Sequence, residues 1–358
     1  MALALQLAAR GLYTTDPNPR VGCVIVRDGE VVGTGWHRRA GEPHAEVYAL
    51  REAGERAQGA TAYVTLEPCC HHGRTPPCSE ALIRAGVARV VAAMEDPNPK
   101  VAGSGLAQLQ QAGIAVESGL LQAQAEDLNP GFVKRMRHGR PYVRCKLAMS
   151  LDGRTAMASG ESKWITGEAA RRDVQRLRAR SSAIMTGIGT VLADDPSLNV
   201  RLDLEQGSRQ PLRVVLDPKL YMPEHARMLA LPGQTLVLTC ADDPDAAARL
   251  AAAGGEVARL PAHGDGLDLH AVMGHLAERQ VNEVLLETGA TLAGAMLAAG
   301  LIDELVLYVA PHIMGSGARG LFRLPGLERM EDRIELDILD IRAVGRDWRI
   351  TAKVASLK

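Results

Sequence analysis

The sequence predicts a two-domain α/β protein. At 358 residues the chain is long enough for two domains that each bury a core of their own. In both halves, short β-rich runs alternate with helical stretches, and in the first half this pattern favours a mixed sheet covered by helices on both faces. A polar segment that becomes basic toward Arg140 interrupts this alternation just before Pro141. We therefore expect domains over residues 1–140 and 141–358.

The first domain is predicted to open with an amphipathic helix and a hairpin. Residues 1–9 are apolar, and the first charge, Arg10, follows this run. A secretory signal has its basic residues before the apolar run, so the pattern argues against one. Asp28-Gly29 separates two β-rich runs, residues 21–26 and 31–36, and an Asp-Gly pair in this position is typical of a hairpin turn. The elements expected next are a helix opening near His44, a strand at 62–66, a helix from Cys78, a strand at 89–94, a helix at 106–112 and a strand at 115–117.

The second domain shows the same alternation. A strand over 142–150 leads into a turn at 151–154, and a helix is predicted over 168–180. Later expected elements are strands at 183–185, 212–216, 235–238, 284–286 and 305–309, a Gly-rich turn at 186–190, two strands near the end, and Ala- and Leu-rich helices between them. No run of about 18 apolar residues occurs, so we expect no membrane partner.

The composition argues against some classes of function. Lys and Arg number 41 against 42 Asp and Glu, so the basic excess of a nucleic-acid-binding protein is missing. Only 3% of residues are aromatic, which leaves few platforms for stacking on bases. Six cysteines in a chain of this length do not make a disulfide framework. These observations predict a cytoplasmic protein with a small-molecule substrate and no nucleic-acid partner.

The segment from His44 to Cys78 predicts a catalytic zinc site. One imidazole (His44) and two thiolates (Cys69 and Cys78) suit tetrahedral zinc and leave a fourth position for water. Zinc lowers the pKa of such a water from about 16 to about 7. Glu46 lies two residues after His44, and residues so spaced do not share a helix face, so Glu46 is a poor ligand for the same metal. We interpret Glu46 as the group that carries protons during hydrolytic deamination.

Other interpretations of this cluster remain open. A histidine and two cysteines also make structural zinc clips, or are simply buried. Cys70 is a competing ligand, but neighbouring side chains rarely point at one metal, so we leave it out. The presence of Glu46 beside His44, and of Pro68 before Cys69, favours the catalytic interpretation.

Two glycine-containing turns suggest a second site. Gly187-Ile188-Gly189 lacks the third glycine of the dinucleotide-binding fingerprint, and a tight turn explains it equally well. Residues 287–294 follow an apolar strand and open a helix with small side chains, which would let a phosphate approach free backbone N–H groups. A simple helix cap is the alternative for this segment.

The H-x-E and P-C motifs resemble those of zinc nucleobase deaminases, except that eight residues separate Cys69 from Cys78, where the commonest form has two. The wide spacing, with Asn-Pro-Arg-Val-Gly at 18–22 and Asp-Pro-Asn-Pro at 96–99, resembles the deaminase half of the bifunctional deaminase–reductases of riboflavin biosynthesis. Residues 142–345, with Lys-Leu-Ala-Met-Ser-Leu-Asp-Gly at 146–153 and Thr-Val-Leu-Ala-Asp-Asp-Pro at 190–196, are similar to the reductase half. The likeness covers nearly the whole chain.

This resemblance implies both fold and cofactors. The first domain would have the three-layer mixed sheet of a cytidine deaminase. The second would resemble dihydrofolate reductase and use NADPH. By position, the family implies substrate contacts at Asn18, His71, Arg74, Ser162, Arg178, Leu198, Arg201 and Glu287. It implies NADPH contacts at Ala148, Trp164, Thr190, Asp194, Asp217 and the turn from Gly289.

The resemblance also implies a reaction sequence. The first half would remove the 2-amino group of 2,5-diamino-6-ribosylamino-4(3H)-pyrimidinone 5′-phosphate, and the second would reduce the ribosyl chain to ribityl, giving 5-amino-6-ribitylaminouracil 5′-phosphate. We expect a homo-oligomer, whose size the sequence does not give. Two rivals stay open: a deaminase of RNA or salvage nucleotides whose second half serves specificity or oligomerisation, and a non-catalytic binding protein stapled by zinc.

Overall fold

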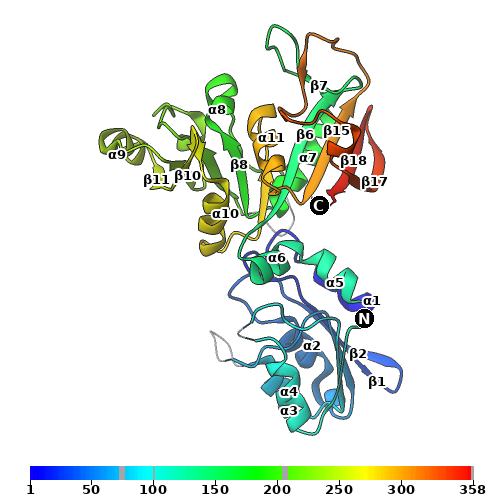
Figure 1. The fold of residues 1–358 in the computed structure, drawn as a ribbon. Helices are drawn as coiled ribbons and strands as arrows, with labels where there is room; N and C mark the ends of the chain where they lie inside the picture. Colours follow the sequence, from blue (N-terminus) through cyan, green and yellow to red (C-terminus); the bar gives the residue numbers. More distant parts are fainter. Residues whose placement is uncertain (72–76, 100, 204–208, 356–358) are drawn as a thin grey trace. The chain divides into compact units, whose positions relative to one another are not determined.

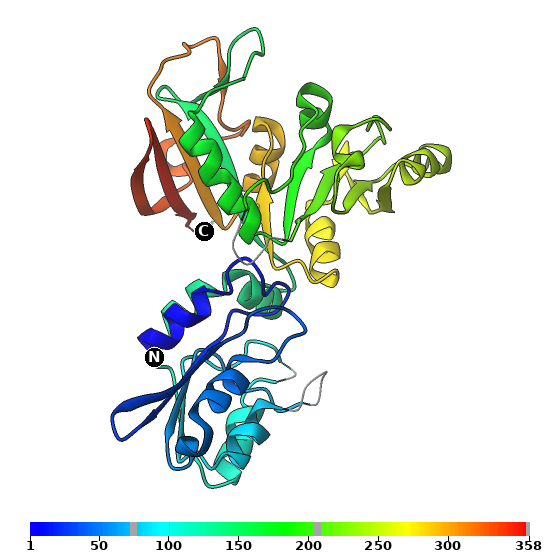
Figure 2. The ribbon, with the colours of Figure 1, turned by 180° about the vertical axis from the view of Figure 1, so that it is seen from behind.

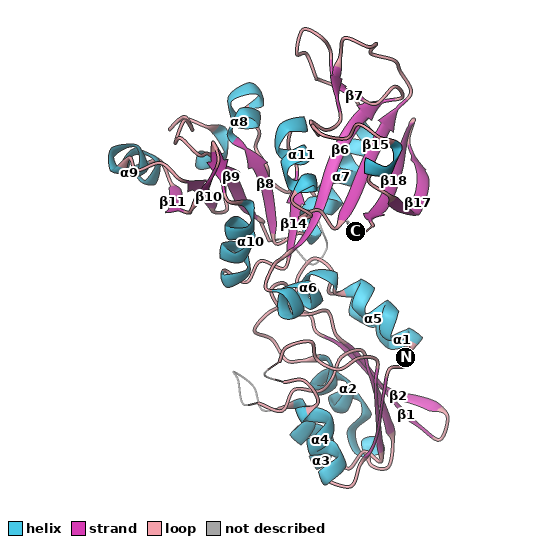
Figure 3. Cartoon of the chain, viewed as in Figure 1, coloured by secondary structure: helices cyan, strands magenta, loops and turns pink. Residues whose placement is uncertain are grey.

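The chain forms two compact units, Met1–Arg140 and Pro141–Lys358, in a computed structural model that describes residues 1–71, 77–99, 101–203 and 209–355. Figure 1 shows the path of the chain through both units, and Figure 3 shows that each combines helices with strands. Within the described ranges, no helix combines the length and the apolar character needed to cross a membrane.

The first unit is built on a five-stranded sheet in the order β2-β1-β3-β4-β5. β1 is antiparallel to β2 and β3, whereas β3, β4 and β5 run parallel, so the sheet is mixed as predicted. Its strands are β1 (Gly22–Arg27), β2 (Glu30–Trp36), β3 (Thr61–Val64), β4 (Arg89–Ala92) and β5 (Ala115–Ser118). Its helices are α1 (Ala2–Ala9), α2 (Ala45–Ala53), α3 (Cys78–Arg84), α4 (Ser104–Gln111), α5 (Gln122–Leu128) and α6 (Pro130–His138).

Helices cover both faces of this sheet, because its strands alternate apolar side chains between the faces. Cys23 and Ile25 of β1 point into a core with α2, α3 and α4, while Val24 between them packs against α1. α2 lies very close to β2: a Cβ added at Gly35 would stand 2.2 Å from the carbonyl oxygen of Ala45. The absence of a side chain at Gly35 allows the first turn of α2 to pack directly on the sheet. The predicted three-layer arrangement is confirmed.

The second unit contains a nine-stranded sheet in the order β11-β10-β9-β8-β14-β6-β15-β18-β17. The seven strands from β11 to β15 run parallel, and the β17–β18 hairpin adds two antiparallel strands at one edge. The strands are β6 (Tyr142–Ser150), β8 (Ala183–Gly187), β9 (Leu212–Leu216), β10 (Thr235–Thr239), β11 (Gly255–Arg259), β14 (Glu283–Leu286), β15 (Glu304–Ala310), β17 (Leu336–Val344) and β18 (Asp347–Val354).

Five helices lie on the two faces of the large sheet. α10 and α11 pack on one face with residues such as Leu286 and Val143, while α7, α8 and α9 pack on the other. Figures 1 and 2, seen from opposite sides, show α10 and α11 in front of the sheet in one view and α7 in front in the other. The helices are α7 (Glu168–Arg180), α8 (Ile188–Asp194), α9 (Pro244–Ala252), α10 (Leu269–Glu278) and α11 (Ala290–Ala298). Short strands complete the unit: β7 (Arg154–Ala156) with β16 (Arg319–Gly320), and β12 (Ala262–His263) with β13 (Gly266–Leu267).

The predicted Gly-rich turn at 186–190 is wrong in extent. β8 continues to Gly187, and α8 begins at the next residue. Gly187 caps this helix with an extended backbone, so the change from strand to helix takes a single residue. The polar segment before Pro141 is helical: α5 and α6 occupy it, and α6 ends on Gly139 in the left-handed conformation.

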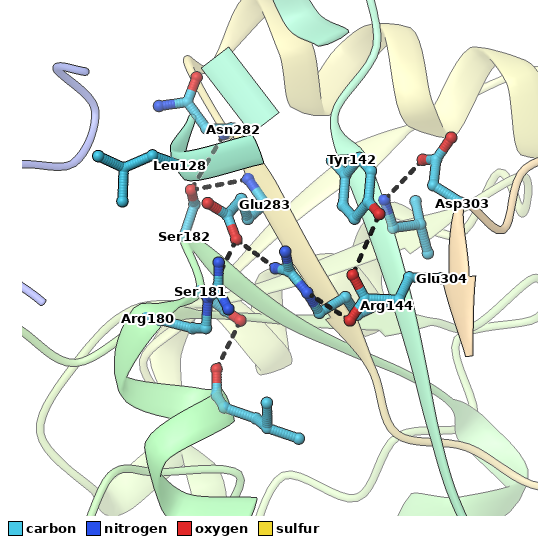
Figure 4. Close-up of polar contacts among 12 residues, drawn as sticks. Leu128, Tyr142, Arg144, Arg180, Ser181, Ser182, Asn282, Glu283, Asp303 and Glu304 are labelled. Atoms are coloured by element: carbon cyan, nitrogen blue, oxygen red, sulfur yellow. Dashed lines mark hydrogen bonds and ion pairs between the residues drawn. The ribbon is translucent and has the colours of Figure 1, made fainter. Parts of the chain in front are cut away.

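A buried charge network joins the amino-terminal ends of three parallel strands. The guanidinium of Arg144 in β6 lies between Glu283 of β14 and Glu304 of β15, with Nε 3.0 Å from Oε1 of Glu304 (Figure 4). The Tyr142 hydroxyl donates to Oε2 of Glu304 at 3.1 Å, and Arg180 Nε lies 3.5 Å from Glu283 Oε2. Paired in this way, the charges can be tolerated inside the sheet.

Candidate functional site

Three predicted metal ligands meet in the first unit. His44 is the residue that precedes α2, Cys69 follows β3, and Cys78 is the first residue of α3. Nδ1 of His44 lies 3.6 Å from the sulfur of Cys69 and 3.3 Å from that of Cys78. Tetrahedral zinc, with bonds of about 2.3 Å to sulfur and 2.0–2.1 Å to nitrogen, would hold such atoms about 3.6 Å apart. The donor set and its spacing fit zinc.

The two sulfurs are prepared to bind a cation. The hydrogen bond from the Cys78 thiol lowers the pKa of Cys69 to about 4, and the same bond together with burial raises the pKa of Cys78. The backbone N–H of Cys78 also points at the Cys69 sulfur, at 3.4 Å. These contacts favour the thiolate form of Cys69, and thiolates are the form in which cysteine sulfurs bind a metal. Cys70 is not a member of this cluster in the described part of the chain.

Glu46 lies in the first turn of α2 and is buried. Burial raises the pKa of its carboxyl group, and among the described residues no partner bonds its Oε2. A buried carboxyl oxygen without a partner is costly unless a ligand satisfies it. The arrangement therefore suits a group that takes up and releases a proton beside the metal cluster.

Sequence reasoning missed Glu67, which shapes the loop beside the metal cluster. Its buried carboxylate accepts hydrogen bonds from the backbone N–H groups of Asp96, Gly103, Gly105 and Leu106, at 2.8 to 3.3 Å. Four N–H donors to one carboxylate hold the segment after β4 against the segment that carries Cys69. The signal in the sequence was weak, because Glu67 is one of many acidic residues next to a proline.

The three predicted substrate contacts of this unit have different outcomes. Asn18 is half-buried, and its side-chain nitrogen lies 3.1 Å from Nε2 of His37, a second residue that sequence reasoning missed. His71 is exposed just after Cys70. Arg74 lies outside the described residues.

In the second unit, the predicted cofactor residues gather at the carboxyl ends of the parallel strands. Ala148 lies near the carboxyl end of β6, and Asp217 follows β9. Gly289 lies between β14 and α11. Thr190 and Asp194 lie in α8, which follows β8 directly. Ligands of open α/β sheets bind at this edge.

The same edge offers polar atoms and space to a dinucleotide. Oδ2 of the fully buried Asp217 accepts a hydrogen bond from the N–H of Met222 at 2.8 Å, while its Oδ1 and the hydroxyl of Thr186 find no partner among the described residues. A Cβ added at Gly289 would meet nothing within 4 Å, so the start of α11 is open to a phosphate. These features fit NADPH.

Trp164 and Asp194 lie at the surface near this edge. The indole of Trp164 is 72% exposed, and the Arg171 guanidinium stacks on it at 4.7 Å. Asp194 pairs with Lys163, whose Nζ lies 3.0 Å from Oδ1. Lys163 therefore links the segment that carries Trp164 to α8.

The predicted substrate residues of this unit centre on Glu287. Its carboxylate receives two hydrogen bonds from Arg178, at 2.6 and 3.0 Å, and Arg178 also donates to the carbonyl of Asn199 at 3.1 Å. Burial would raise the pKa of Glu287, but Arg178, Lys146 and Arg201 together bring it below its usual value. Lys146, which sequence reasoning gave no role, has a pKa lowered by burial. Ser162 is half-buried, Leu198 is buried and Arg201 is exposed.

The comparisons with known proteins cover both units. Residues 1–94 match the cytidine and deoxycytidylate deaminase zinc-binding region, and residues 141–350 match the RibD C-terminal domain. The riboflavin biosynthesis protein RibD of Escherichia coli K12 is 56% identical over 97% of this chain and 96% of its own length. That of Haemophilus influenzae is 50% identical, over 98% and 95%.

Solved structures agree with these matches. Acinetobacter baumannii RibD superposes with a TM-score of 0.91 at 48% identity, over 99% of this chain and 97% of its own. A diaminohydroxyphosphoribosylaminopyrimidine deaminase/5-amino-6-(5-phosphoribosylamino)uracil reductase from Thermotoga maritima gives 0.86 at 31%, over the same shares. The expected fold classes of both halves are confirmed. The chain belongs to the RibD family of riboflavin-biosynthesis proteins, which joins a zinc-dependent deaminase domain to an NADPH-dependent reductase domain.

Proposed function

We propose that residues 1–140 deaminate 2,5-diamino-6-ribosylamino-4(3H)-pyrimidinone 5′-phosphate and that residues 141–358 then reduce the ribosyl chain of the product to ribityl. The observation that carries this proposal is the meeting of His44, Cys69 and Cys78 beside a buried carboxyl oxygen of Glu46 that has no partner among the described residues. A structural zinc clip has no need of such a carboxyl group. Matches to both halves of the chain also favour a bifunctional enzyme over the two rival functions.

In the deamination, His44, Cys69 and Cys78 would hold zinc, which supplies a water acidified to near neutrality. Glu46 would accept a proton from that water, pass it to a ring nitrogen of the pyrimidine, and assist the departure of ammonia. Burial raises the pKa of the Glu46 carboxyl group, which makes it easier for this group to take up a proton from the water and hold it until the ring nitrogen accepts it. Asn18, His71 and Arg74 would contact the substrate.

In the reduction, NADPH would supply the hydride to the sugar carbon that carries the ring amine. Ala148, Trp164, Thr190, Asp194, Asp217 and Gly289 would hold the cofactor along the carboxyl edge of the sheet. Ser162, Arg178, Leu198, Arg201 and Glu287 would hold the substrate.

The two arginines have different parts in this arrangement. Arg178 already donates to Glu287 and to the Asn199 carbonyl, so its contribution is to hold that carboxylate in place. Arg201 is exposed and is better placed to bind two oxygens of the substrate phosphate with its planar guanidinium. The Arg201→Ala variant should therefore bind substrate more weakly while NADPH affinity stays unchanged.

The Glu46→Gln variant tests the deaminase assignment. Zinc content, measured on the purified protein, should stay at one ion per chain, because Glu46 is not a ligand. Ammonia release from the diaminopyrimidine substrate should fall by 10² or more, the usual range for a lost proton-transfer group being about 10²–10⁴. Loss of zinc, or activity near that of the parent protein, would refute the assigned role.

We also propose a homo-oligomer formed through β17. This strand is the outer edge of the large sheet, and Ile338, Leu339 and Ile341 on it are each more than half exposed. An edge strand of this kind readily pairs with another strand. Antiparallel pairing of two copies centred on Ile341 would place Asp340 of each opposite Arg342 of the other. Ile341→Lys should lower the mass seen by sedimentation if this surface is used.

The cytoplasm is the proposed location. All six cysteines lie within the described ranges and none is in a disulfide. The proposed zinc ligands must stay reduced, as they do in a reducing compartment.

A further inference from the structure

His37 is enclosed beside the metal cluster although no role has been given to it so far. It follows β2, is only 2% exposed, and its backbone N–H donates to the carbonyl of Val21 at 2.9 Å. Gly11 packs closely on the backbone of His37: a Cβ added at Gly11 would lie 2.9 Å from the His37 carbonyl oxygen. The ring therefore has little freedom to turn.

Both ring nitrogens of His37 have partners, and together these fix the position of the proton. Nδ1 lies 3.1 Å from the carbonyl oxygen of Pro43, and Nε2 lies 3.1 Å from the side-chain nitrogen of Asn18. A carbonyl oxygen can only accept, so Nδ1 carries the hydrogen. The side-chain nitrogen of Asn18 can only donate, so Nε2 is bare and the ring is neutral. Nε2 then accepts, and the Asn18 amide must present its N–H₂ to the ring.

This orientation decides what Asn18 can offer on its other side. With the N–H₂ group donating to His37, the carbonyl oxygen Oδ1 of Asn18 is turned away from the ring. That oxygen is an acceptor, so it can receive a hydrogen bond from an N–H of a ligand but cannot satisfy a bare ring nitrogen. Aminopyrimidinones of the proposed substrate class carry N–H groups on the ring and on its substituents.

The second partner of His37 connects it to the metal ligand. The Pro43 carbonyl accepts the hydrogen bond from Nδ1 of His37, and Pro43 is followed directly by His44. The rings of His37 and His44 also touch edge to face, with centroids 5.5 Å apart and planes at 87°. His37 thus braces both the backbone just before His44 and the imidazole itself.

We propose that His37 is a positioning residue that fixes the Asn18 amide with its carbonyl oxygen free for a substrate N–H, and that fixes His44 for zinc through the Pro43 carbonyl. The first part rests on the proposed function, in which Asn18 contacts the substrate. The Asn18 carbonyl oxygen would then favour pyrimidines that present an N–H group to it. The second part does not depend on the substrate.

Two substitutions separate the two contacts. The amide of asparagine mimics Nδ1 of histidine, so His37→Asn can still donate to Pro43 but no longer reaches Asn18. The longer glutamine mimics Nε2, so His37→Gln can still accept from Asn18 but releases the Pro43 carbonyl. His270→Gln, at an exposed position of α10, is the matched control and should resemble the parent protein in every measurement.

We expect one variant to weaken substrate binding and the other to weaken metal binding. His37→Asn should raise the KM of deamination about tenfold, the upper range for one hydrogen bond, with kcat and the rate of zinc loss to a chelator little changed. His37→Gln should keep KM within about threefold of the parent value and lose zinc at least several times faster. Equal effects of both variants on both quantities would reduce His37 to a packing residue and overturn the proposal.

A spectroscopic measurement tests the tautomer without relying on enzyme activity. In the zinc-loaded protein, the ¹⁵N spectrum of His37 should show a protonated Nδ1 and a bare Nε2. Asn18→Asp, which has no N–H to donate, should shift the Nε2 signal toward the protonated form. A protonated Nε2 in the parent protein would overturn the proposal, whether or not the protein releases ammonia. Absence of ammonia release with the predicted tautomer present would instead refute the proposed function and, with it, the substrate part of this inference.

Discussion

Arg178 and Glu287 are joined by two parallel hydrogen bonds, Nε to Oε1 at 2.6 Å and Nη2 to Oε2 at 3.0 Å. Both side chains are 12% exposed, so the pair is largely shielded from water. Lys146 lies close enough to add a second positive charge. The carboxylate therefore holds the Arg178 guanidinium in place at the proposed reductase site.

Removing the charge of Glu287 should destabilise the second unit. Glu287→Gln leaves the largely buried Arg178 guanidinium without its counter-charge, and breaking such a pair typically costs about 3–5 kcal/mol. Urea denaturation at pH 7 should show a loss of this order, while Glu278→Gln at an exposed position should show almost none.

The cost of Glu287→Gln should depend on pH in a defined direction. The pKa of Glu287 is lowered in the folded protein, so its stabilising effect is fully present above the unfolded value of about 4.3 and is lost as pH falls through the folded value. The difference between parent and variant should therefore shrink below pH 4. A difference that is constant from pH 7 to pH 3 would contradict the ion-pair account.

The metal cluster predicts which cysteines control zinc content. Cys69→Ser and Cys78→Ser should each lose most bound zinc, because the thiolate is the ligand that zinc prefers here. Cys70→Ser is the matched control and should keep one ion per chain, since the Cys70 thiol is outside the cluster. Metal analysis after gel filtration is the measurement, and zinc loss in the Cys70 variant alone would contradict the assignment.

Glu67 should be important for stability. In Glu67→Gln, the amide N–H₂ group would face backbone N–H groups that now donate to a carboxylate oxygen. Leaving buried donors unsatisfied costs about 1–3 kcal/mol, more when the lost acceptor is charged. Denaturation of the variant, with the exposed Glu55→Gln as control, should show a loss of at least 2 kcal/mol. A loss equal to that of the control would mean that the segment after β4 is held by other contacts.

The network around Arg144 makes a prediction for a double variant (Figure 4). Arg144→Met leaves Glu283 and Glu304 as buried carboxylates, with a cost of about 3–5 kcal/mol. Adding Glu304→Gln removes one of those charges, so the double variant should be more stable than Arg144→Met alone. Strict additivity of the two substitutions in a denaturation cycle would argue that the charges do not interact.

The metal site could be predicted because ligand chemistry leaves a signature in the sequence. Few arrangements other than zinc binding combine His44, Cys69 and Cys78 with a glutamate two residues after the histidine. The alternation of strands and helices could also be predicted, since β-rich runs such as residues 212–216 stand between helical stretches, whereas the mostly parallel order of the second sheet followed only from the family resemblance.

Other features depend on contacts between distant segments and left no such signature. His37 gains its role from Asn18 and from the Pro43 carbonyl, and neither partner can be inferred from a histidine at the end of a strand. Arg144 was expected simply as part of a strand, since its burial depends on glutamates more than 130 residues away. The turn at 186–190 was predicted too long because Gly187 alone caps α8.

The measurement that tests the account most directly follows ammonia release and NADPH oxidation together, on the purified, zinc-loaded protein supplied with the diaminopyrimidine ribosyl phosphate. The account predicts that NADPH is consumed only after ammonia has been released, and that Glu46→Gln abolishes both signals. The same variant should still oxidise NADPH when it receives the deaminated product. NADPH oxidation by Glu46→Gln on the undeaminated substrate, or ammonia release that is never followed by NADPH oxidation in the parent protein, would contradict it.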